Sequence, residues 1–398
     1  LRRIQSKSGK AKTSKSLYYD ERGRVSAERM RIRAGGPTRR FNFDYGYDDA
    51  GRRRSLVYPS ADDRHQDRLV TDYSDFGLPL TLELETAAGT EIIVEGASYD
   101  LHGNLIELRY GNGLSDLFGY GSDGRTTRLE CIRTLLSDKT GQAGMPGQAC
   151  HSEDSDLAAA MVGARDAAGN ITMVDEPGRR RITQSYDALG RLVEWQDSQR
   201  GPLSFDYDGL GNLVRDGTRS FLYDSGHPQR PLRAGNDAME YDAGGNLVAR
   251  GHRSYDYDSL GRLVEVGEDG DPVLQNYFDE SERRVASFDH GSGTRNYFFG
   301  EAFEVRGPAL VRHFRFGQLM VASDQVAAGR RLSLGKPAAG VTPARLFYHR
   351  DYRGSVTMVT DSGGQVSSRS SYGPYGKRAA GHTGQTSMGF AGSSDEAA

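Results

Sequence analysis

Short runs of hydrophobic and polar residues fill this chain, and each run ends at a cluster of turn-forming residues. In the run that starts at Arg191, for example, Leu192 and Val193 are followed by Glu194 and Trp195. Such short runs, separated by breaks that contain Gly, predict β-strands joined into hairpins by turns of three to five residues. The pattern therefore predicts an all-β chain.

The breaks repeat one motif, Tyr-x-x-x-Gly. Its ten copies begin at Tyr19, Tyr47, Tyr73, Tyr99, Tyr120, Arg165 (where Arg replaces Tyr), Tyr186, Tyr207, Tyr241 and Tyr257. Seven carry the full Tyr-Asp-x-x-Gly signature: Tyr19, Asp20 and Gly23; Tyr47, Asp48 and Gly51; Tyr99, Asp100 and Gly103; Tyr186, Asp187 and Gly190; Tyr207, Asp208 and Gly211; Tyr241, Asp242 and Gly245; and Tyr257, Asp258 and Gly261. Arg or Asn follows the Gly in nine of the ten, and Phe278-Asp279 begins a degenerate copy without Gly. Such self-similarity indicates a repeat architecture.

Each residue of the signature has a structural interpretation. We expect Asp187 to accept hydrogen bonds from backbone N–H groups of the turn, as Asp does in Asx-turns. Gly190 is expected to supply the positive φ that closes the hairpin. Recurring tyrosines such as Tyr186 are expected to stack, aromatic over aromatic, from one hairpin to the next. The signature thus predicts turns and stacks, and we assign no catalytic role to it.

Composition supports a sheet with little core. Hydrophobic residues make up 36% of the chain, whereas Gly numbers 51 of 398 residues and Tyr numbers 21. Abundant Gly without a triplet period indicates many turns, and abundant Tyr favours strands over disorder. These proportions are typical of a thin sheet with water on both faces.

The net charge of -3 is unevenly distributed. Residues 1–54 contain 16 Lys and Arg against 6 Asp and Glu, a local charge of +10 that leaves -13 for the remainder. The basic segment 1–16 is interpreted either as an arm for nucleic acid or membranes or as a solvated, frayed strand, and we favour the strand. No apolar run approaches the 18 residues of a membrane span, and no signal peptide is present in the chain.

Cys131 and Cys150 are the two cysteines of the chain. They could close one loop by a disulfide or remain two reduced thiols, and the sequence leaves both alternatives open. The interval that contains them, 131–160, is predicted to be an insertion or an eroded repeat.

At its end the chain resembles the YD-repeat or RHS-repeat proteins, a family that includes bacterial polymorphic toxins, insecticidal toxin-complex shell proteins and the shells of teneurins. The likeness covers residues 17–392 and is most specific in the RHS-associated core, 346–398. The matching core residues are Tyr348, Asp351, Gly354, Ser355, Tyr372, Pro374, Tyr375 and Gly376. Tyr352 and Arg353 stand where the family usually has His-Leu, so the resemblance implies no role for that pair.

The resemblance implies a spiralling single-layer sheet that forms part of a hollow shell. In the toxin members this shell encloses a C-terminal toxin segment, which an aspartyl self-cleavage module after the core frees. The chain stops at Ala398 before any such module, so we expect it to be a truncated part of a longer protein. The implied partners are the toxin segment of the same polypeptide and secretion-system or toxin-complex subunits, with no nucleic acid and no transmembrane segment.

The sequence contains no recognisable catalytic or metal-binding motif. The nine histidines are scattered and lack zinc-site spacing, so we interpret them as ordinary surface or strand residues. Residues 329–336 imitate a phosphate-binding loop but have one residue too many, and Pro337 stands where Ser or Thr is required. We therefore predict no enzyme activity, no cofactor and no metal site.

These observations favour a structural shell segment, with YD repeats at 17–130 and 161–345, that protects a C-terminal toxin effector. The first alternative is a cell-surface or wall-associated scaffold for carbohydrate binding and adhesion, because exposed Tyr and Arg could stack on sugars. The second is a decayed fragment without independent function. In its parent protein the segment is expected to be secreted or at the cell surface.

Overall fold

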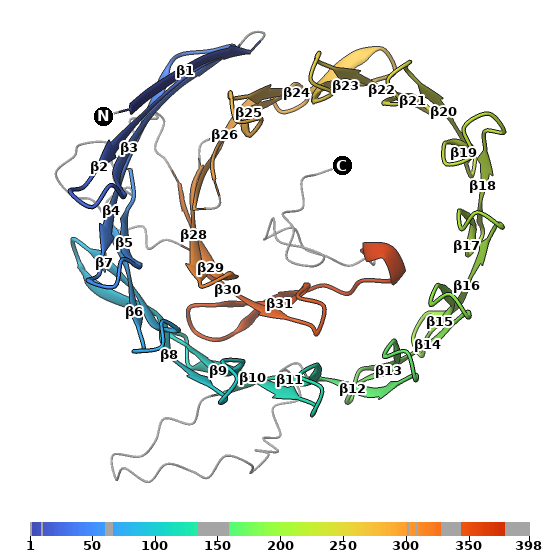
Figure 1. The fold of residues 1–398 in the computed structure, drawn as a ribbon, viewed down its shortest axis with the longest axis horizontal. Helices are drawn as coiled ribbons and strands as arrows, with labels where there is room; N and C mark the ends of the chain where they lie inside the picture. Colours follow the sequence, from blue (N-terminus) through green and yellow to red (C-terminus); the bar gives the residue numbers. More distant parts are fainter. Residues whose placement is uncertain are drawn as a thin grey trace. The chain divides into compact units, whose positions relative to one another are not determined.

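A computed structural model describes residues 2–8, 11–59, 67–133, 159–300, 302–307, 309–327 and 344–378. These residues form 32 strands and one 3₁₀ turn, η1 (Pro374–Gly376), and contain no α-helix. Strands adjacent in the sequence pair antiparallel, and in Figure 1 successive hairpins follow one another along the chain. The prediction of an all-β chain of tandem hairpins is confirmed.

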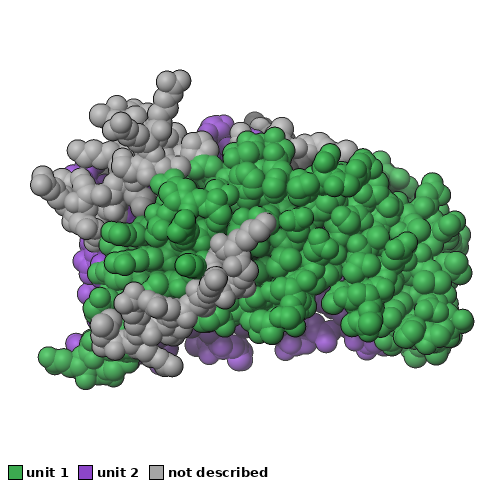
Figure 2. All heavy atoms as spheres, turned by 90° about the horizontal axis from the view of Figure 1, so that it is seen from above, with its two compact units in different colours: residues 1–42, 183–309 green, residues 43–182, 310–398 purple. Residues whose placement is uncertain are grey.

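The chain divides into two compact units, which Figure 2 colours green and purple. Unit 1 comprises residues 1–42 and 183–309, and unit 2 comprises residues 43–182 and 310–398. Both units therefore combine an early and a late part of the sequence. The segment predicted as 1–16 holds one whole strand and part of another, and most of the predicted insertion 131–160, including Cys150, lies outside the described residues.

Unit 1 contains β1 (Arg2–Ser8), β2 (Ala11–Tyr19), β3 (Val25–Ala34), the start of β4 (Arg39–Tyr47), the end of β14 (Arg180–Tyr186), β15 (Leu192–Asp197), β16 (Gly201–Tyr207), β17 (Leu213–Asp216), β18 (Arg219–Tyr223), β19 (Pro231–Ala234), β20 (Asp237–Tyr241), β21 (Leu247–Arg250), β22 (Arg253–Tyr257), β23 (Leu263–Glu268), β24 (Asp271–Phe278), β25 (Arg284–Asp289), β26 (Thr294–Phe299) and β27 (Phe303–Arg306). The strands β15 to β23 pair with their sequence neighbours, and most of their side chains are exposed or half-buried.

A second layer covers one end of unit 1. The ring of Phe41 in β4 lies 3.7 Å from the ring of Phe299 and 6.1 Å from that of Phe303, measured between centroids. The β3–β4 turn lies close to this layer, because a Cβ on Gly36 would lie 2.6 Å from a guanidinium nitrogen of Arg295. Ile32 and Ala34 of β3 are fully buried. This end of unit 1 therefore has an apolar, aromatic core.

Unit 2 contains the rest of β4, β5 (Arg53–Val57), β6 (Arg68–Tyr73), β7 (Pro79–Thr86), β8 (Gly89–Tyr99), β9 (Leu105–Tyr110), β10 (Leu114–Tyr120), β11 (Thr126–Arg133), β12 (Ala159–Arg165), β13 (Ile171–Glu176), the start of β14, nearly all of β28 (Ala309–Phe316), β29 (Leu319–Ala327), β30 (Ala344–Arg350), β31 (Val356–Asp361) and β32 (Val366–Arg369). Here β28 to β31 form a layer against β5 to β10, and Leu82, Ile93 and Leu108 on the facing side are fully buried.

This second layer corrects the expectation of a sheet with water on both faces. That expectation suits β15 to β23, but in unit 2 the late strands cover one face of the early strands. Apolar and polar residues alternate along β7, and Leu82 and Leu84 on its apolar side are buried. An alternation shows that a face is apolar without showing which distant segment covers it.

Candidate functional site

The Tyr-Asp-x-x-Gly motif builds one turn, seen clearly at Asp187. The backbone N–H of Asp187 donates to the carbonyl oxygen of Arg191 at 3.0 Å, and the N–H of Gly190 donates to the carbonyl of Asp187 at 2.9 Å. The Asp187 Oδ1 atom accepts the N–H groups of Leu189 and Arg191, both at 2.9 Å. Gly190 has a φ of +74°, which favours Gly over other residues.

The residue after the Gly completes this turn with its side chain. The Nε of Arg191 donates to Asp187 Oδ2 at 2.6 Å, and in another copy the Nδ2 of Asn212 donates to Asp208 Oδ2 at 2.8 Å. Arg and Asn are interchangeable here because both present an N–H group to the second carboxylate oxygen. Sequence reasoning noticed this Arg/Asn preference but gave it no role.

The other copies use the same arrangement. Positive φ values occur at all the signature glycines: Gly23 (77°), Gly51 (85°), Gly103 (82°), Gly190 (74°), Gly211 (89°), Gly245 (89°) and Gly261 (72°). The side-chain contact to the Asp recurs at Asp20, Asp48, Asp100, Asp242 and Asp258. In the RHS-associated core, Asp351 Oδ1 accepts the N–H of Ser355 at 2.9 Å and Gly354 has a φ of +80°. The core therefore begins with the same turn.

The tyrosines connect neighbouring hairpins. The hydroxyl of Tyr207 donates to the carbonyl of Leu192 in the preceding hairpin at 2.9 Å, and the guanidinium of Arg191 lies 4.6 Å from the centre of its ring. These contacts put a cation over the ring, and the expected aromatic-over-aromatic stacking stays a prediction. The hydroxyl contact recurs at Tyr73, Tyr99, Tyr120, Tyr223 and Tyr241. Tyr19, Tyr47, Tyr186 and Tyr257 occupy the equivalent position at the end of their strands.

One copy escaped the sequence search. Tyr223 and Asp224 begin a turn whose loop is longer, so the N–H of Asp224 donates to the carbonyl of Arg230 at 3.0 Å. The guanidinium of Arg230 then lies 5.8 Å from the ring centre of Tyr241, as Arg191 does over Tyr207. A search for Gly at a fixed distance from Tyr misses such a copy, although its Tyr-Asp pair was visible.

The degenerate copy retains the turn without its Gly. The N–H of Asp279 donates to the carbonyl of Arg283 at 3.0 Å, and Arg262 lies 4.9 Å from the ring centre of Phe278. Glu282 occupies the Gly position with a φ of +61°. This conformation is strained for a residue with a Cβ atom.

The turn carboxylates are held in their charged form. The side-chain N–H of Asn212 holds the pKa of Asp208 below its usual value, and the backbone N–H of Arg191 does so for Asp187. The pKa values of Asp20, Asp48, Asp100, Asp166, Asp242 and Asp258 are lowered as well. The reason is general, because hydrogen bonds to a carboxylate favour ionisation.

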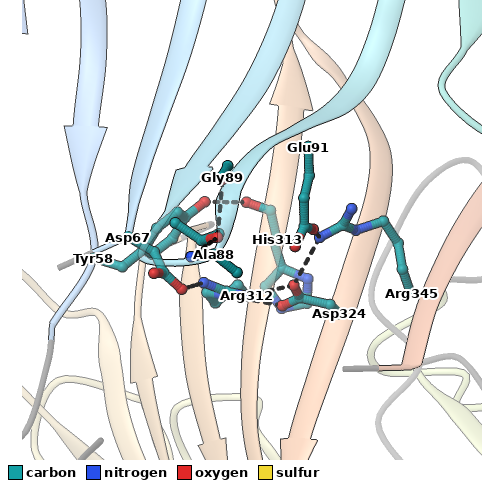
Figure 3. A network of polar contacts seen from close by, with 10 residues as sticks. Tyr58, Asp67, Ala88, Gly89, Glu91, Arg312, His313, Asp324 and Arg345 are labelled. Atoms are coloured by element: carbon teal, nitrogen blue, oxygen red, sulfur yellow. Dashed lines mark hydrogen bonds and ion pairs between the residues drawn. The ribbon is translucent and has the colours of Figure 1, made fainter. Parts of the chain in front are cut away.

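A buried ion network joins the two layers of unit 2 (Figure 3). The Nε and Nη2 atoms of Arg312 donate to the two carboxylate oxygens of Asp324 at 2.8 and 2.6 Å, and a third nitrogen of Arg312 contacts Asp67. Arg345 contacts Glu91 at 2.6 Å and Asp324 at 3.4 Å. Asp324 is fully buried, whereas Asp67 and Glu91 come from the facing layer.

Charge compensation is strong in this network. Burial by itself lowers the pKa of Arg312, but the carboxylate of Asp324 more than offsets that effect and the pKa is raised. Beside it, the hydroxyl of Tyr58 donates to the carbonyl of His313 at 3.0 Å, and burial raises the pKa of Tyr58. The guanidinium of Arg312 therefore stays charged, and it ties β28 to β29 and to Asp67, the residue just before β6.

A second buried cluster centres on His349 in β30. Its Nδ1 atom lies 2.7 Å from Oδ1 of Asp116, and its Nε2 atom lies 2.9 Å from Oγ1 of Thr360. Asn112 donates to the same Thr360 oxygen at 2.9 Å, and the hydroxyl of Tyr110 donates to Asp116 Oδ2 at 2.7 Å. The histidines were expected to be ordinary surface or strand residues, but His349 is 2% exposed and joins β30 to β10.

This order of hydroxyl, imidazole and carboxylate resembles that of a nucleophilic triad. Thr360 is fully buried, however, and Asn112 already donates to its oxygen. A hydroxyl in this environment lacks an approach for a substrate, so we assign the cluster a positioning role: it fixes the RHS-associated core against β9 and β10. Tyr348 also contributes, because its hydroxyl contacts Ser323 and its carbonyl oxygen lies 3.2 Å from the hydroxyl of Tyr110.

The remaining residues of the RHS-associated core lie near the C-terminal end of the described chain. Tyr372 is buried and its hydroxyl donates to the carbonyl of Val356 at 3.1 Å. Pro374, Tyr375 and Gly376 form η1, in which Tyr375 has a φ of +56° and an exposed side chain. In the substituted pair, Arg353 contacts Asp351 at 3.1 Å and lies over the ring of Tyr352. Cys150, with which Cys131 could form a disulfide, and the loop 329–336 lie outside what the structure describes.

Replacing Glu282 by Gly is expected to stabilise the protein by about 0.5–1 kcal/mol, because it removes the strain of a positive φ at some cost in chain entropy. The reverse exchange Gly23→Glu is the matched control, since a Cβ at Gly23 meets nothing within 4 Å and so tests φ alone. Thermal unfolding should show Glu282→Gly raising Tm and Gly23→Glu lowering it. A lower Tm for Glu282→Gly contradicts the interpretation.

Stability should fall as pH decreases through the range of the turn carboxylates. Their folded pKa values lie below the unfolded value of about 3.9, so the stabilisation is complete above that value and is lost as pH falls through the folded values. The triple variant Asp100→Asn, Asp208→Asn and Asp242→Asn should therefore lose less Tm than the natural sequence between pH 7 and pH 3. Equal losses in the two proteins would exclude the turns as the source.

Removal of Asp324 leaves two buried guanidinium groups without their shared partner. We expect Asp324→Ala to cost about 3–5 kcal/mol, the range for breaking a buried ion pair. The control Asp206→Ala breaks the exposed pair with Arg215 and should cost at most about 1 kcal/mol. Denaturant unfolding of both variants measures the difference, and similar costs would show that the network does not hold the layers together.

Comparisons with known proteins agree with this geometry. The family model Teneurin YD-shell matches residues 163–396, more than half of the chain. No curated protein matches the sequence.

Several solved structures share the fold. The structure of TcdB2-TccC3-TEV superposes with a TM-score of 0.75 over 96% of this chain, at 14% identity, and TcdB2-TccC3-Cdc42 with 0.71 over 96%, also at 14% identity. The Tc holotoxin pore of Photorhabdus luminescens gives 0.64 over 92% at 14% identity. This chain spans only about one fifth of the length of those chains: the matched regions make up 21%, 21% and 20% of them, respectively. At 14% identity, this similarity shows a shared fold and nothing further.

Three observations support the same family assignment: the repeated turns, the RHS-associated core that begins with such a turn, and the match to the family model. The chain belongs to the teneurin YD-shell family of RHS/YD-repeat proteins, and it is a structural shell scaffold.

Proposed function

We propose that this segment is part of a shell that encloses a C-terminal toxin effector of the same polypeptide and protects it until delivery. The observation that carries the proposal is the fit of 96% of the chain to the fold of TcdB2-TccC3, whose solved forms include one described as lacking a hypervariable C-terminal region. In this role the segment is a container without catalysis, and its partners are the enclosed segment and toxin-complex subunits. The parent protein is secreted or acts at the cell surface.

The two-layered parts suit such a role. A container wall must resist opening, and in unit 2 the buried Arg312–Asp324 pair ties β28 to β29, while His349 holds the RHS-associated core against β10. The described residues contain no helix long and apolar enough to span a membrane. We propose that the wall acts through its rigidity and by enclosing the effector.

Limited proteolysis of the parent protein tests the proposal. The polypeptide downstream of residue 398 should resist thermolysin in the intact parent and be digested rapidly when it is made alone. The variant Asp324→Ala, which weakens the ion network between the two layers of unit 2, should shorten the protection, whereas Asp206→Ala should leave it unchanged.

Two results would contradict enclosure. The first is digestion of the downstream segment at the same rate in the parent as in isolation. The second is a reading frame in which only anchoring or repeat sequence follows residue 398, which would favour the surface scaffold for carbohydrate binding.

A further inference from the structure

The first strands of unit 1 carry a positively charged face. In the pairing of β2 with β3, Lys12 stands opposite Arg33, while Arg31 and Arg29 stand opposite Ser14 and Ser16. Cross-strand partners share one face of a sheet, and so do alternate residues along a strand. Lys12, Arg31 and Arg33 are exposed, and Arg29 is half-buried. The four cations therefore lie on a single face.

The next strand extends the same face. Arg40 in β4 is exposed, whereas its neighbour Phe41 points to the second layer, where its ring lies 3.7 Å from that of Phe299. Because successive side chains alternate, Arg40 points away from that layer. The buried residues Ile32 and Ala34 confirm that the cationic side of β3 is the outer one. We call these five residues, Lys12, Arg29, Arg31, Arg33 and Arg40, the basic face.

β2 and β3 contain one acidic residue between them, and β4 contributes Asp44, which lies four positions after Arg40 and so on the same side of the strand. Glu28 is the one acid in β2 and β3, and it pairs across to Leu17, on the opposite side from Arg29. Its carboxylate contacts Lys15 at 2.8 Å. The basic segment that the sequence analysis interpreted as an arm or a frayed strand is thus, from Lys12 onward, an ordered sheet whose outer side concentrates charge.

We propose that the basic face docks onto an anionic lipid surface. Five cations on one side of a sheet form a cluster of the size that binds acidic lipid headgroups. Strand spacing of about 4.8 Å and alternate residues about 7 Å apart spread these charges over a broad plane, which matches a bilayer surface. The guanidinium groups suit phosphate because they donate in pairs. Tyr18, which is 42% exposed beside Arg29, fits the headgroup region.

A lipid surface suits this face better than a nucleic acid. Proteins that bind single strands use a groove with rings on which bases stack, and proteins that bind duplexes insert an element into a groove. The ring of Tyr18 already has the guanidinium of Arg29 at 5.9 Å from its centre. The basic face spreads its cations over a plane and offers no free ring for base stacking. More of these cations can therefore contact a flat bilayer than a cylindrical nucleic-acid duplex.

Vesicle sedimentation of the full chain tests the docking. Vesicles of phosphatidylserine and phosphatidylcholine should bind it at low salt, while pure phosphatidylcholine vesicles should not, and 0.5 M salt should release it. The variant Arg31→Gln/Arg33→Gln should weaken binding about 25-fold, at about fivefold per cation. The control Arg54→Gln/Arg68→Gln changes the net charge equally at exposed ion pairs in unit 2 and should change binding less than twofold.

Other results would overturn the proposal. Equal losses in the two double variants would mean that only the net charge matters. Equal binding to neutral vesicles would exclude the basic face as the cause. Binding of single-stranded DNA that depends on Arg31 and Arg33, without binding to acidic vesicles, would assign the face to nucleic acid. If the Arg31→Gln/Arg33→Gln variant unfolds, as judged by circular dichroism, Lys12→Gln replaces it with an expected fivefold loss.

Discussion

The hydrogen bonds of one carboxylate in each hairpin turn support the rest of this structure. In a turn such as that of Asp208, one oxygen accepts two backbone N–H groups and the other accepts the side chain of Asn212. The Gly supplies a backbone conformation that few other residues tolerate. The turn therefore closes without any apolar core, which allows hairpins of only four or five residues per strand, as in β17 and β18.

The same contacts link each hairpin to its neighbour. The Arg that completes one turn lies over the aromatic ring of the next repeat, and that ring's hydroxyl group bonds back to the preceding hairpin, as Arg191 and Tyr207 show. Stability then spreads from neighbour to neighbour, as in other repeat proteins. This arrangement explains how a chain with only 36% hydrophobic residues forms an extended sheet.

The local part of this fold was predictable from the sequence, and the long-range part was not. Turn chemistry depends on residues within five positions of one another, so Asp187 and Gly190 could be assigned correctly before the structure. The burial of His349 depends on Asp116, far away in the sequence, and Arg312 likewise meets Asp67. A single sequence contains no signal for such pairings, because a lone His or Arg in a strand resembles a surface residue. The second layer, and with it the anchoring of the core, was therefore missed.

Hydrogen exchange with mass spectrometry on the natural protein and on Asp208→Ala tests most directly whether the turn carboxylate holds its hairpin. In Asp208→Ala we expect faster exchange in residues 204–216, which include the turn between β16 and β17, and unchanged exchange in the hairpin around Asp100. Unchanged exchange in residues 204–216 would contradict it, since the hairpin would then be held by contacts other than its carboxylate.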